Sequence, residues 1–398
     1  MITVLLFIVI LGILVLAHEF GHFISARKFG MKTYEFGFGY PPRAFGFYRD
    51  PETKKIKWVW GKGRRGTRNE ERGTSLKKTI AGDDQGQEFG AMLWSFNWLP
   101  IGGFVRIKGE NGENANDPDS FGYHKAWKRA VVLVAGVTMN FILAGVILGL
   151  GFMIGLPADL SQGVDKHAKI IEPASVIVQQ VQNDTPAQEA GLTFGDKILK
   201  LDDVEIKNIT AMNEYIDSKD GELIIASVVR GKEALSISIT PRVLEGGKDA
   251  DIGIAVAEAG VISYPWYIAI YKGFVAATFG IINIFIAFYY LIKNLILGQG
   301  LLFEVAGPVG IANIVGQSAK LGFNYILNVT AMLSLSLAVI NILPIPALDG
   351  GRVLFIMIEK IIRRPVSMKY EQLAHTIGFV LLMALVVVVT WRDVVGLF

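Results

Sequence analysis

Two histidines four positions apart are the residues of this chain best suited to chemistry. His18 and His22 enclose the stretch His-Glu-Phe-Gly-His, which lies in an apolar run that begins near residue 2. Residues at i and i+4 of a helix share one face, so both imidazoles can bind one metal ion while Glu19 lies beside the open coordination position. Because the chain contains no cysteine, His, Asp and Glu must supply the ligands of any zinc ion. The pattern predicts a zinc site with Glu19 as general base.

The position of this pattern inside an apolar segment strengthens the prediction. An ionisable side chain in a membrane span costs roughly 2.5 to 3.5 kcal/mol on insertion scales, so three polar residues in one turn need a compensating partner. A bound metal ion would supply one. The alternative is that hydrogen bonds between helices satisfy the two histidines. The other three histidines, at 124, 167 and 375, show no comparable spacing.

Asp349 is the residue expected to complete the metal site. A catalytic zinc normally keeps three protein ligands and one water, and Asp349 is the only acid in the third hydrophobic segment. Pro344 and Pro346 end or distort the helix before it, and such a break is tolerated at membrane depth where it is buried or lines a wet cavity. From residue 2, His18 lies about 25 Å along its helix, a depth comparable to that of Asp349. The alternative is an acid at a helix end in a glycine turn.

Length and composition indicate a membrane protein with water-facing parts. The chain has 398 residues, of which 52% are hydrophobic, and the apolar residues are concentrated in blocks. Four segments are long enough to span a bilayer core of about 30 Å, at residues 2–25, 130–156, 325–346 and 373–391. The first lacks a basic start and has its polar residues where a signal cleavage site would lie, so we expect it to be retained. A net charge of +3, dispersed along the chain, gives no basis for nucleic-acid binding.

Orientation follows from the loops, because Lys and Arg accumulate on the cytoplasmic side of a membrane. The first loop, residues 27–129, is basic, and the second, residues 157–262, is acidic. We therefore expect the first loop inside and the second outside. The basic residues that weigh most in the first loop are Arg64, Arg65, Arg68, Arg72, Lys77 and Lys78.

The expected sides of the loops then limit how often the apolar stretch 264–297 can cross the membrane: it must cross an even number of times or not at all. The connection between the last two spans is also basic, with Lys360, Arg363, Arg364 and Lys369, so it too should be cytoplasmic. A single crossing by 264–297 would put that connection on the wrong side. The sequence predicts a helix that lies at the interface or re-enters the membrane over residues 262–298.

The residues between 168 and 245 form a separate strand-rich module. Short β-rich runs alternate there with Gly and Asp turns. The stretch Thr185 to Leu192, followed by Gly195 and Asp196, resembles the helix, turn and strand entry of PDZ domains found in bacterial proteases. PDZ domains capture extended peptides by strand addition at an exposed edge, so a peptide or substrate tail is the partner this module implies. The alternative is a structural spacer without a ligand.

Taken together, the motifs resemble the site-2 protease family of intramembrane zinc metalloproteases, of the bacterial regulator of sigma-E protease type. The first motif, the stretch Asn341 to Gly351, the PDZ-like module and the four-span plan all agree. The resemblance implies Zn²⁺ held by His18, His22 and Asp349, with Glu19 as base and Asn341 as an oxyanion or substrate-positioning group. Asn341 could instead bond between helices. The substrates implied are single-span membrane proteins, such as anti-sigma factors or remnant signal peptides.

A glycine-containing stretch in the first loop also fits the family. Residues 101–107 resemble its membrane-associated β-hairpin, and residues 36–39 resemble an adjoining strand. The resemblance implies substrate binding by a run of five residues, Gly102, Gly103, Phe104, Val105 and Arg106. The alternative is an ordinary amphipathic hairpin. The chain departs from well-known members in having one PDZ-like module instead of two and in the apolar stretch 264–297.

These inferences define a fold class and a domain plan. We expect an α-helical, multi-pass protein of the bacterial cytoplasmic membrane, with four transmembrane helices, a cytoplasmic-side membrane-associated β-hairpin region and one extracytoplasmic PDZ-like α+β domain. The active site would face the cytoplasm. The expected segments are 1–26, 27–128, 129–157, 168–245, 262–298, 324–352 and 372–392. Two rival functions remain open, a zinc or divalent-cation transporter and a catalytically inactive PDZ scaffold.

Overall fold

The computed structural model describes residues 2–61, 91–112, 114–160, 165–182, 184–231, 233–243, 249–298, 306–364 and 366–395. The chain divides into two compact units. The hairpin unit consists of Phe7–Leu143 and Ser334–Arg392, and the sheet unit consists of Met1–Leu6, Ala144–Leu333 and Asp393–Phe398. The loop basic residues between 64 and 78, on which the orientation depends, lie outside the described residues.

Within the described residues, five helices, rather than the four expected, are long and apolar enough to cross a membrane. They are α1 (Ile2–Lys28), α2 (Ala126–Ile154), α5 (Trp266–Leu297), α7 (Phe323–Ile342) and α9 (Met368–Val395). The fifth is α5, an uninterrupted helix of 32 residues that covers the stretch expected to lie at the interface or re-enter. Its placement in the bilayer stays a prediction.

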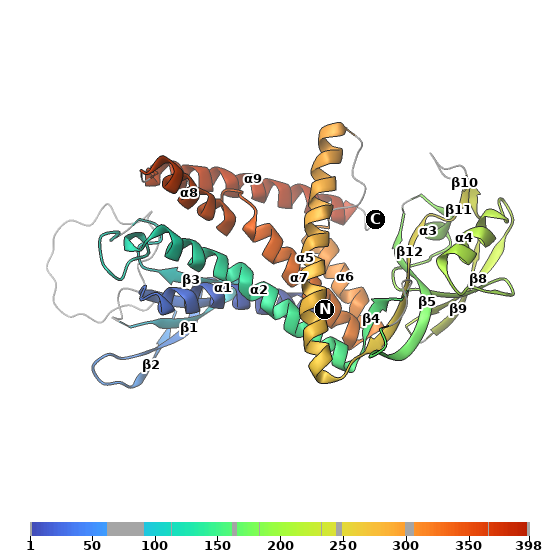
Figure 1. Ribbon diagram of the computed structural model, residues 1–398, viewed down its shortest axis with the longest axis horizontal. Helices are drawn as coiled ribbons and strands as arrows, with labels where there is room; N and C mark the ends of the chain where they lie inside the picture. The colour runs from blue at the N-terminus through green and yellow to red at the C-terminus, as the bar shows by residue number, and fades with distance from the viewer. Residues whose placement is uncertain are drawn as a thin grey trace. The chain divides into compact units, whose positions relative to one another are not determined.

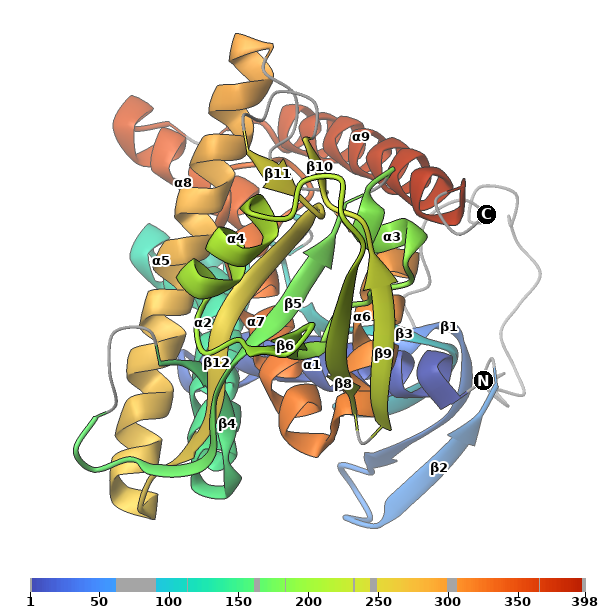
Figure 2. The same cartoon turned by 90° about the vertical axis from the view of Figure 1, so that its right-hand side faces the viewer.

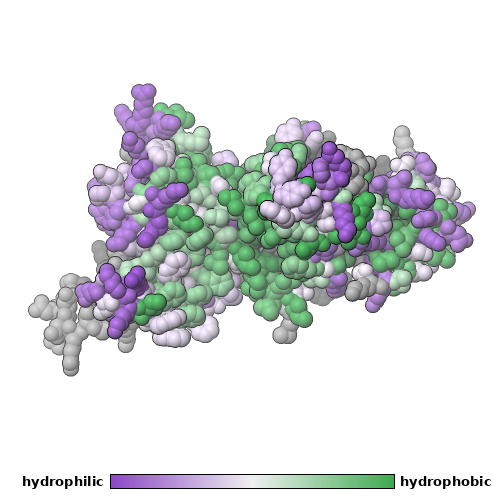
Figure 3. Space-filling model, turned by 60° about the horizontal axis from the view of Figure 1, so that its bottom comes forward, coloured by the Kyte–Doolittle hydropathy of each residue, from purple (hydrophilic) through white to green (hydrophobic). Residues whose placement is uncertain are grey.

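The long helices leave a broad apolar surface exposed, as a bilayer requires (Figure 3). In the most apolar window of α9 only 6% of residues are buried, and in that of α5 only 11%. Side chains this apolar would not face water over such lengths in a soluble protein, so the helices are suited to contact lipid.

In the hairpin unit, α1 and α2 lie side by side (Figure 1). Their close approach depends on Gly21, because a Cβ there would collide with the backbone of Ala135. The helix α1 runs without proline through its apolar stretch and ends in the basic pair Arg27 and Lys28, which suits the negative end of a helix dipole. Gly30, at φ 82°, then turns the chain in a left-handed conformation toward the sheet.

The hairpin unit contains a three-stranded sheet in the order β2-β1-β3. Its strands are β1 (Thr33–Arg49), β2 (Ile56–Trp60) and β3 (Leu93–Ile107). The first part of β1 pairs with both arms of β3, so it lies between residues 93–96 and residues 103–107. Within the described residues, the second arm of β3 pairs with β1 on one side and with no strand on the other. This arm, which contains most of the stretch expected to bind substrate, is therefore an edge of the sheet.

The chain breaks between α7 and α8 (Asp349–Ile362), where the two prolines lie. The third span was expected to end at 346, whereas α7 ends at Ile342 and a short turn leads to Asp349 at the first position of α8. Gly350 and Gly351 are required here, because a Cβ at either would collide with backbone carbonyl oxygens of the turn. A Cβ at Gly378 of α9 would likewise collide with the backbone of Pro346, so α9 packs directly on this turn.

The main sheet of the sheet unit has the order β4-β12-β5-β6-β8-β9, with β7 paired to β6 (Figure 2). The strands are β4 (Leu156–Asp159), β5 (Lys169–Val181), β6 (Lys197–Leu201), β7 (Val204–Glu205), β8 (Ile224–Arg230), β9 (Glu233–Ile239) and β12 (Ile254–Ser263), with β10 (Arg242–Val243) and β11 (Ala250–Asp251) as a separate pair. The helices α3 (Pro186–Glu189) and α4 (Ile209–Asp217) flank it. The sheet extends past the expected boundary at 245, because β12 pairs along β5.

Within the sheet unit, α5 crosses the end of α2 at a small-residue contact (Figure 1). A Cβ at Gly273 of α5 would collide with the backbone of Gly145 and Gly149 of α2. Small residues let two helix backbones approach closely, which is the usual means of packing helices in a membrane. A shorter helix, α6 (Pro308–Leu321), follows α5 in the chain, and a Cβ at its Gly316 would collide with Thr3 of α1.

Candidate metal centre

Three side chains from two distant parts of the chain converge in the hairpin unit. Asp349 Oδ2 lies 2.9 Å from His18 Nε2 and 3.2 Å from His22 Nε2, and the two imidazole nitrogens lie 3.1 Å apart. Both histidines are buried, with 7% and 6% of their surface exposed. Among the residues that the structure describes, these three form the group of His and acidic side chains suited to hold a metal ion.

The donor set and the space around it suit zinc. Two imidazole nitrogens and one carboxylate oxygen form a three-ligand set of the kind that leaves a fourth position open at catalytic zinc. Gly136 of α2 lies against the Nε2 atoms of His18 and His22. A Cβ there would lie 2.5 Å from His22 Nε2 and 2.8 Å from His18 Nε2, so only glycine leaves this space free.

The Nδ1 atoms of His18 and His22 both contact groups of α2. His22 Nδ1 donates to the carbonyl oxygen of Val132 at 2.8 Å, which leaves His22 Nε2 able to bind a metal ion. His18 Nδ1 lies 3.5 Å from the fully buried side-chain amide of Asn140. A His18 that binds through Nε2 carries its proton on Nδ1, so the amide of Asn140 would present its oxygen to that proton. Ser334 fixes this part of α2 by donating its hydroxyl to the carbonyl oxygen of Asn140 at 2.8 Å.

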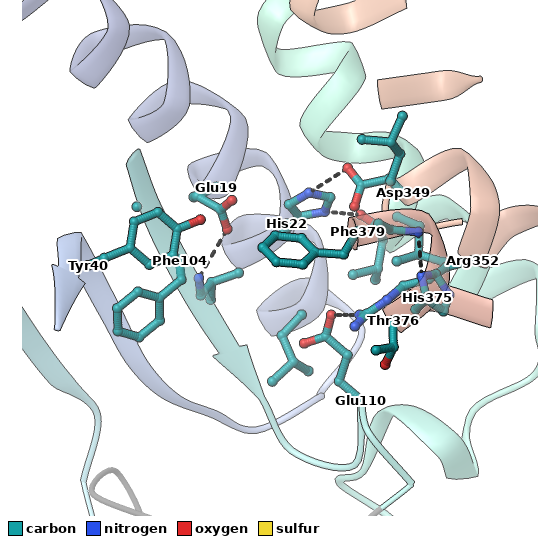
Figure 4. Close-up of a pocket in the computed structure, with 17 residues that line it drawn as sticks. Glu19, His22, Tyr40, Phe104, Glu110, Asp349, Arg352, His375, Thr376 and Phe379 are labelled. Carbon is teal, nitrogen blue, oxygen red and sulfur yellow. Dashed lines mark hydrogen bonds and ion pairs between the residues drawn. The ribbon is translucent and has the colours of Figure 1, made fainter. Parts of the chain in front are cut away.

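Glu19 lies beside the ligands and contacts the edge strand. Its Oε2 accepts a hydrogen bond from the backbone N–H of Val105 at 3.0 Å. The carboxylate lines a cavity of about 540 Å³ together with His22 and Asp349 (Figure 4). The bond to Val105 orients the carboxylate and leaves Oε1 available to a water molecule in that cavity.

The cavity contains part of the stretch expected to bind substrate. Gly103, Phe104 and Val105 line it, whereas Gly102 and Arg106 do not. Gly102, at φ 90°, lies against the ring of Tyr40, which itself lines the cavity. Of the nearby strand residues 36–39, Phe36, Gly37 and Phe38 pair with both arms of β3.

Asn341 is not among the residues that line the cavity. It lies on the last turn of α7 and is partly exposed, and its role as an oxyanion or substrate-positioning group stays a prediction.

Several polar residues of the cavity escaped the sequence analysis, among them Arg352, Glu110 and His375. Arg352, one turn after Asp349 on α8, forms an ion pair with Glu110 (Figure 4). His375 of α9 accepts the backbone N–H of Ala347 through Nδ1 at 2.8 Å. The sequence did offer one signal for such residues. His375 and Asn140 are polar residues inside apolar segments, where polar residues are rare. Their spacing along the chain carries no pattern.

The site has the composition of a zinc peptidase inside apolar helices: three ligands that leave room for water, and a carboxylate that can move a proton beside them. The sequence model of peptidase family M50 matches residues 6–57 and 83–385 of this chain. The chain belongs to peptidase family M50, which confirms the resemblance to site-2 proteases. It is an integral membrane protein of the zinc metalloprotease class.

Relatives match this chain over almost its full length. The regulator of sigma-W protease RasP of Bacillus subtilis is 30% identical and covers 100% of this chain and 99% of its own length. The zinc metalloprotease RasP of Oceanobacillus iheyensis is 30% identical and covers 100% of both chains. A putative zinc metalloprotease of Clostridium perfringens is 31% identical over 96% of this chain and 95% of its own. Among solved structures, the PDZ domain of an SdrC-like protein from Listeria monocytogenes is 26% identical, covers 21% of this chain and 86% of its own, and has a TM-score of 0.20.

Proposed function

We propose that this protein is an intramembrane zinc endopeptidase that hydrolyses peptide bonds of single-span membrane proteins. One observation carries the proposal: His18, His22 and Asp349 meet around one point, and Glu19 shares a cavity with them. The names of the relatives, which are zinc metalloproteases, support the same reaction. By analogy with the sigma-W regulator of Bacillus subtilis, the substrates belong to regulated intramembrane proteolysis, with membrane-anchored anti-sigma factors or remnant signal peptides as the class.

The proposed mechanism assigns each polar group one task. His18, His22 and Asp349 hold the ion, and zinc when bound supplies Lewis acidity toward a carbonyl and toward a water molecule near neutral pH. Glu19 accepts a proton from the attacking water and returns it to the leaving amine. The N–H of Val105 orients Glu19 for both transfers. Asn341 is proposed to steady the substrate.

Substrate would be presented as an extended strand. A substrate helix protects its peptide bonds by hydrogen bonding, so it must unwind locally before attack. In the part of the chain that the structure describes, the arm Gly103–Ile107 of β3 pairs with β1 on one side, and the backbone N–H of Val105 on its other side donates to Glu19. Strand addition to that edge would hold the unwound segment across the cavity. Arg106 on this arm and Gly102 just before it, both outside the cavity lining, would contact the flanking parts of the segment.

We place the PDZ-like module outside the bacterial cytoplasmic membrane and the metal site toward the cytoplasm. The acidic sequence of the second loop and the basic connection between α8 and α9 support this orientation. A substrate would then meet the module before its membrane segment reaches the metal site.

The substitution Glu19→Gln separates proteolysis from metal binding. We expect it to abolish cleavage of a single-span helical substrate in proteoliposomes, because the amide cannot accept the proton, while zinc content stays at the wild-type level. The same vesicles, loaded with a zinc-sensitive dye, test the transporter function. Retained cleavage by Glu19→Gln would contradict the assignment, as would zinc flux without proteolysis. A wild-type protein that binds zinc and peptide but cleaves nothing would favour an inactive scaffold.

A further inference from the structure

Tyr40, on strand β1, lines the metal cavity together with Glu19. Figure 4 shows its phenol hydroxyl directed toward the carboxylate of Glu19. The strand residues singled out from the sequence, 36–39, end one position before Tyr40. A hydroxyl at this position can reach a peptide that lies across the cavity, beside the carboxylate that would accept the proton of the attacking water.

Two neighbouring glycines of β3 bring the ring of Tyr40 and the side chain of Glu19 to adjacent places. A Cβ at Gly102 would lie 2.7 Å from Cε2 of the Tyr40 ring, so only glycine lets the ring lie against the strand there. A Cβ at Gly103 would lie 3.7 Å from Cγ of Glu19, which is ordinary contact. The ring and the carboxylate therefore flank consecutive residues of the strand expected to hold the substrate.

The backbone that carries Tyr40 is held in place from β3. The buried side-chain amide of Asn97 donates to the carbonyl oxygen of Gly39 at 3.0 Å. Gly39 has φ 76°, and a Cβ there would lie 2.3 Å from the carbonyl oxygen of Leu99, so glycine is required. A side chain whose ring and backbone are both held in this way can present its hydroxyl at one fixed place, as catalysis requires.

The hydroxyl of Tyr40 makes no hydrogen bond within the described part of the chain, and 53% of the residue is exposed. Two other donors that line the cavity are already engaged. Arg352 forms its ion pair with Glu110, and the hydroxyl of Thr376 donates to the carbonyl oxygen of Gln372 at 2.8 Å. The hydroxyl of Tyr40 is therefore available to a substrate.

The surroundings keep this hydroxyl protonated. Burial, and after it the negative charge of Glu19, raises the pKa of the Tyr40 phenol above its ordinary value. At neutral pH the phenol is therefore a hydrogen-bond donor. When water attacks a peptide carbonyl, negative charge develops on the carbonyl oxygen, and a donor fixed beside that oxygen stabilises the transition state more than the ground state.

We propose that Tyr40 is a catalytic residue whose phenol hydroxyl donates a hydrogen bond to the carbonyl oxygen of the scissile peptide bond. The proton stays on the phenol throughout. The proton of the attacking water still passes to Glu19 and then to the leaving amine. Tyr40 lines the cavity, whereas Asn341 does not, so Tyr40 is the better placed of the two to contact this oxygen. The inference rests on the proposed function, because it concerns the same reaction.

The first test compares the kinetics of the full-length wild type, Tyr40→Phe and Tyr123→Phe on one single-span helical substrate in detergent. Phenylalanine keeps the ring against Gly102 and removes only the hydroxyl. We expect kcat of Tyr40→Phe to fall about 100-fold while KM changes by less than about twofold. Zinc content and the midpoint of thermal unfolding should match the wild type. Tyr123, an exposed tyrosine of the hairpin unit outside the cavity lining, is the matched control and should keep wild-type kinetics.

The second test reads binding instead of turnover. A peptide with a phosphinate in place of the scissile amide is tetrahedral and anionic, as the transition state is. Its affinity for Tyr40→Phe should fall by about the same factor as kcat/KM. The unmodified substrate, measured in the Glu19→Gln background so that it stays intact, should bind equally well with and without Tyr40→Phe.

The inference is overturned if Tyr40→Phe cleaves as fast as the wild type, if its loss lies in KM alone, or if the phosphinate peptide binds both proteins equally. Equal losses in Tyr40→Phe and Tyr123→Phe would overturn it as well. Each of these results, obtained with a wild type that cleaves the substrate, leaves the proposed function intact. A wild type that cleaves no substrate overturns both.

Discussion

At the scale of single residues, the proposed zinc ligands could be predicted from residue type and spacing, whereas the residues that support them could not. His18 and His22 could be identified because a helix brings i and i+4 together, and Asp349 because it is an isolated acid at similar depth. Gly136 and Asn140 act through contacts between α1 and α2. The sequence alone does not show which residues of α2 contact α1, so it gives no reason to single out one glycine or one asparagine of α2.

We predict that Asn140 supports zinc binding through its contact with His18. Replacing it with leucine removes the group that holds His18 Nδ1, so zinc affinity should fall about 10- to 100-fold. Competition with a chromogenic chelator measures this directly. Thr138→Val is the matched control, because Thr138 lies on an exposed part of α2 and bonds only to Val134 of its own helix within the described residues. Equal zinc affinity in Asn140→Leu and the control would refute the role given to Asn140.

At the scale of elements, the turn before α8 positions Asp349 next to His18 and His22. The prolines predicted that a helix would end there, and α7 does end at Ile342. The return of the chain as α8 was not predicted, because it depends on glycines that admit backbone contacts between Gly350 and the turn. The strand β12 was missed for a similar reason. Its pairing with β5 joins residues far apart in sequence, and its sequence, rich in alanine, lacks the strong β pattern of the other strands.

We predict that His375 stabilises the turn before α8 and thereby the position of Asp349. It accepts the N–H of Ala347, a residue held at φ 83°, two positions before Asp349. His375→Leu leaves that N–H without an acceptor, a loss of about 1 to 3 kcal/mol. We expect a lower midpoint of thermal unfolding and zinc binding weakened about tenfold. His375→Asn places an amide oxygen where Nδ1 lies and should retain most of both. If the Leu and Asn variants lose zinc equally, the hydrogen bond does not position Asp349.

At the scale of the whole molecule, the exposed apolar helices and the separate strand-rich sheet agree with the expected class of membrane protein. The number of spans was the weakest part of the sequence analysis, because α5 satisfies length and hydropathy as well as the others. Within the sheet unit α5 crosses the end of α2 steeply instead of running beside it (Figure 1). A helix that crosses a span in this way is suited to lie along the membrane surface, as the parity of the loops predicts.

The absence of native cysteine makes the topology testable. We introduce Asp220→Cys in the PDZ-like module or Ser367→Cys in the connection before α9, both at exposed positions. With a membrane-impermeant maleimide on intact spheroplasts, the cysteine at 220 should react, and the cysteine at 367 should react only after permeabilisation. Reaction of both in intact spheroplasts would mean that α5 crosses the membrane, and the orientation argued from the loops would be wrong.

The central claim is that His18, His22 and Asp349 bind one zinc ion. Elemental analysis of the purified protein in metal-replete buffer tests it most directly. We predict one zinc ion per chain in the wild type and in Glu19→Gln, and a large loss of zinc in Asp349→Ala after the same dialysis. A wild-type protein without stoichiometric zinc, or an Asp349→Ala variant that holds zinc as tightly as the wild type, would contradict the account.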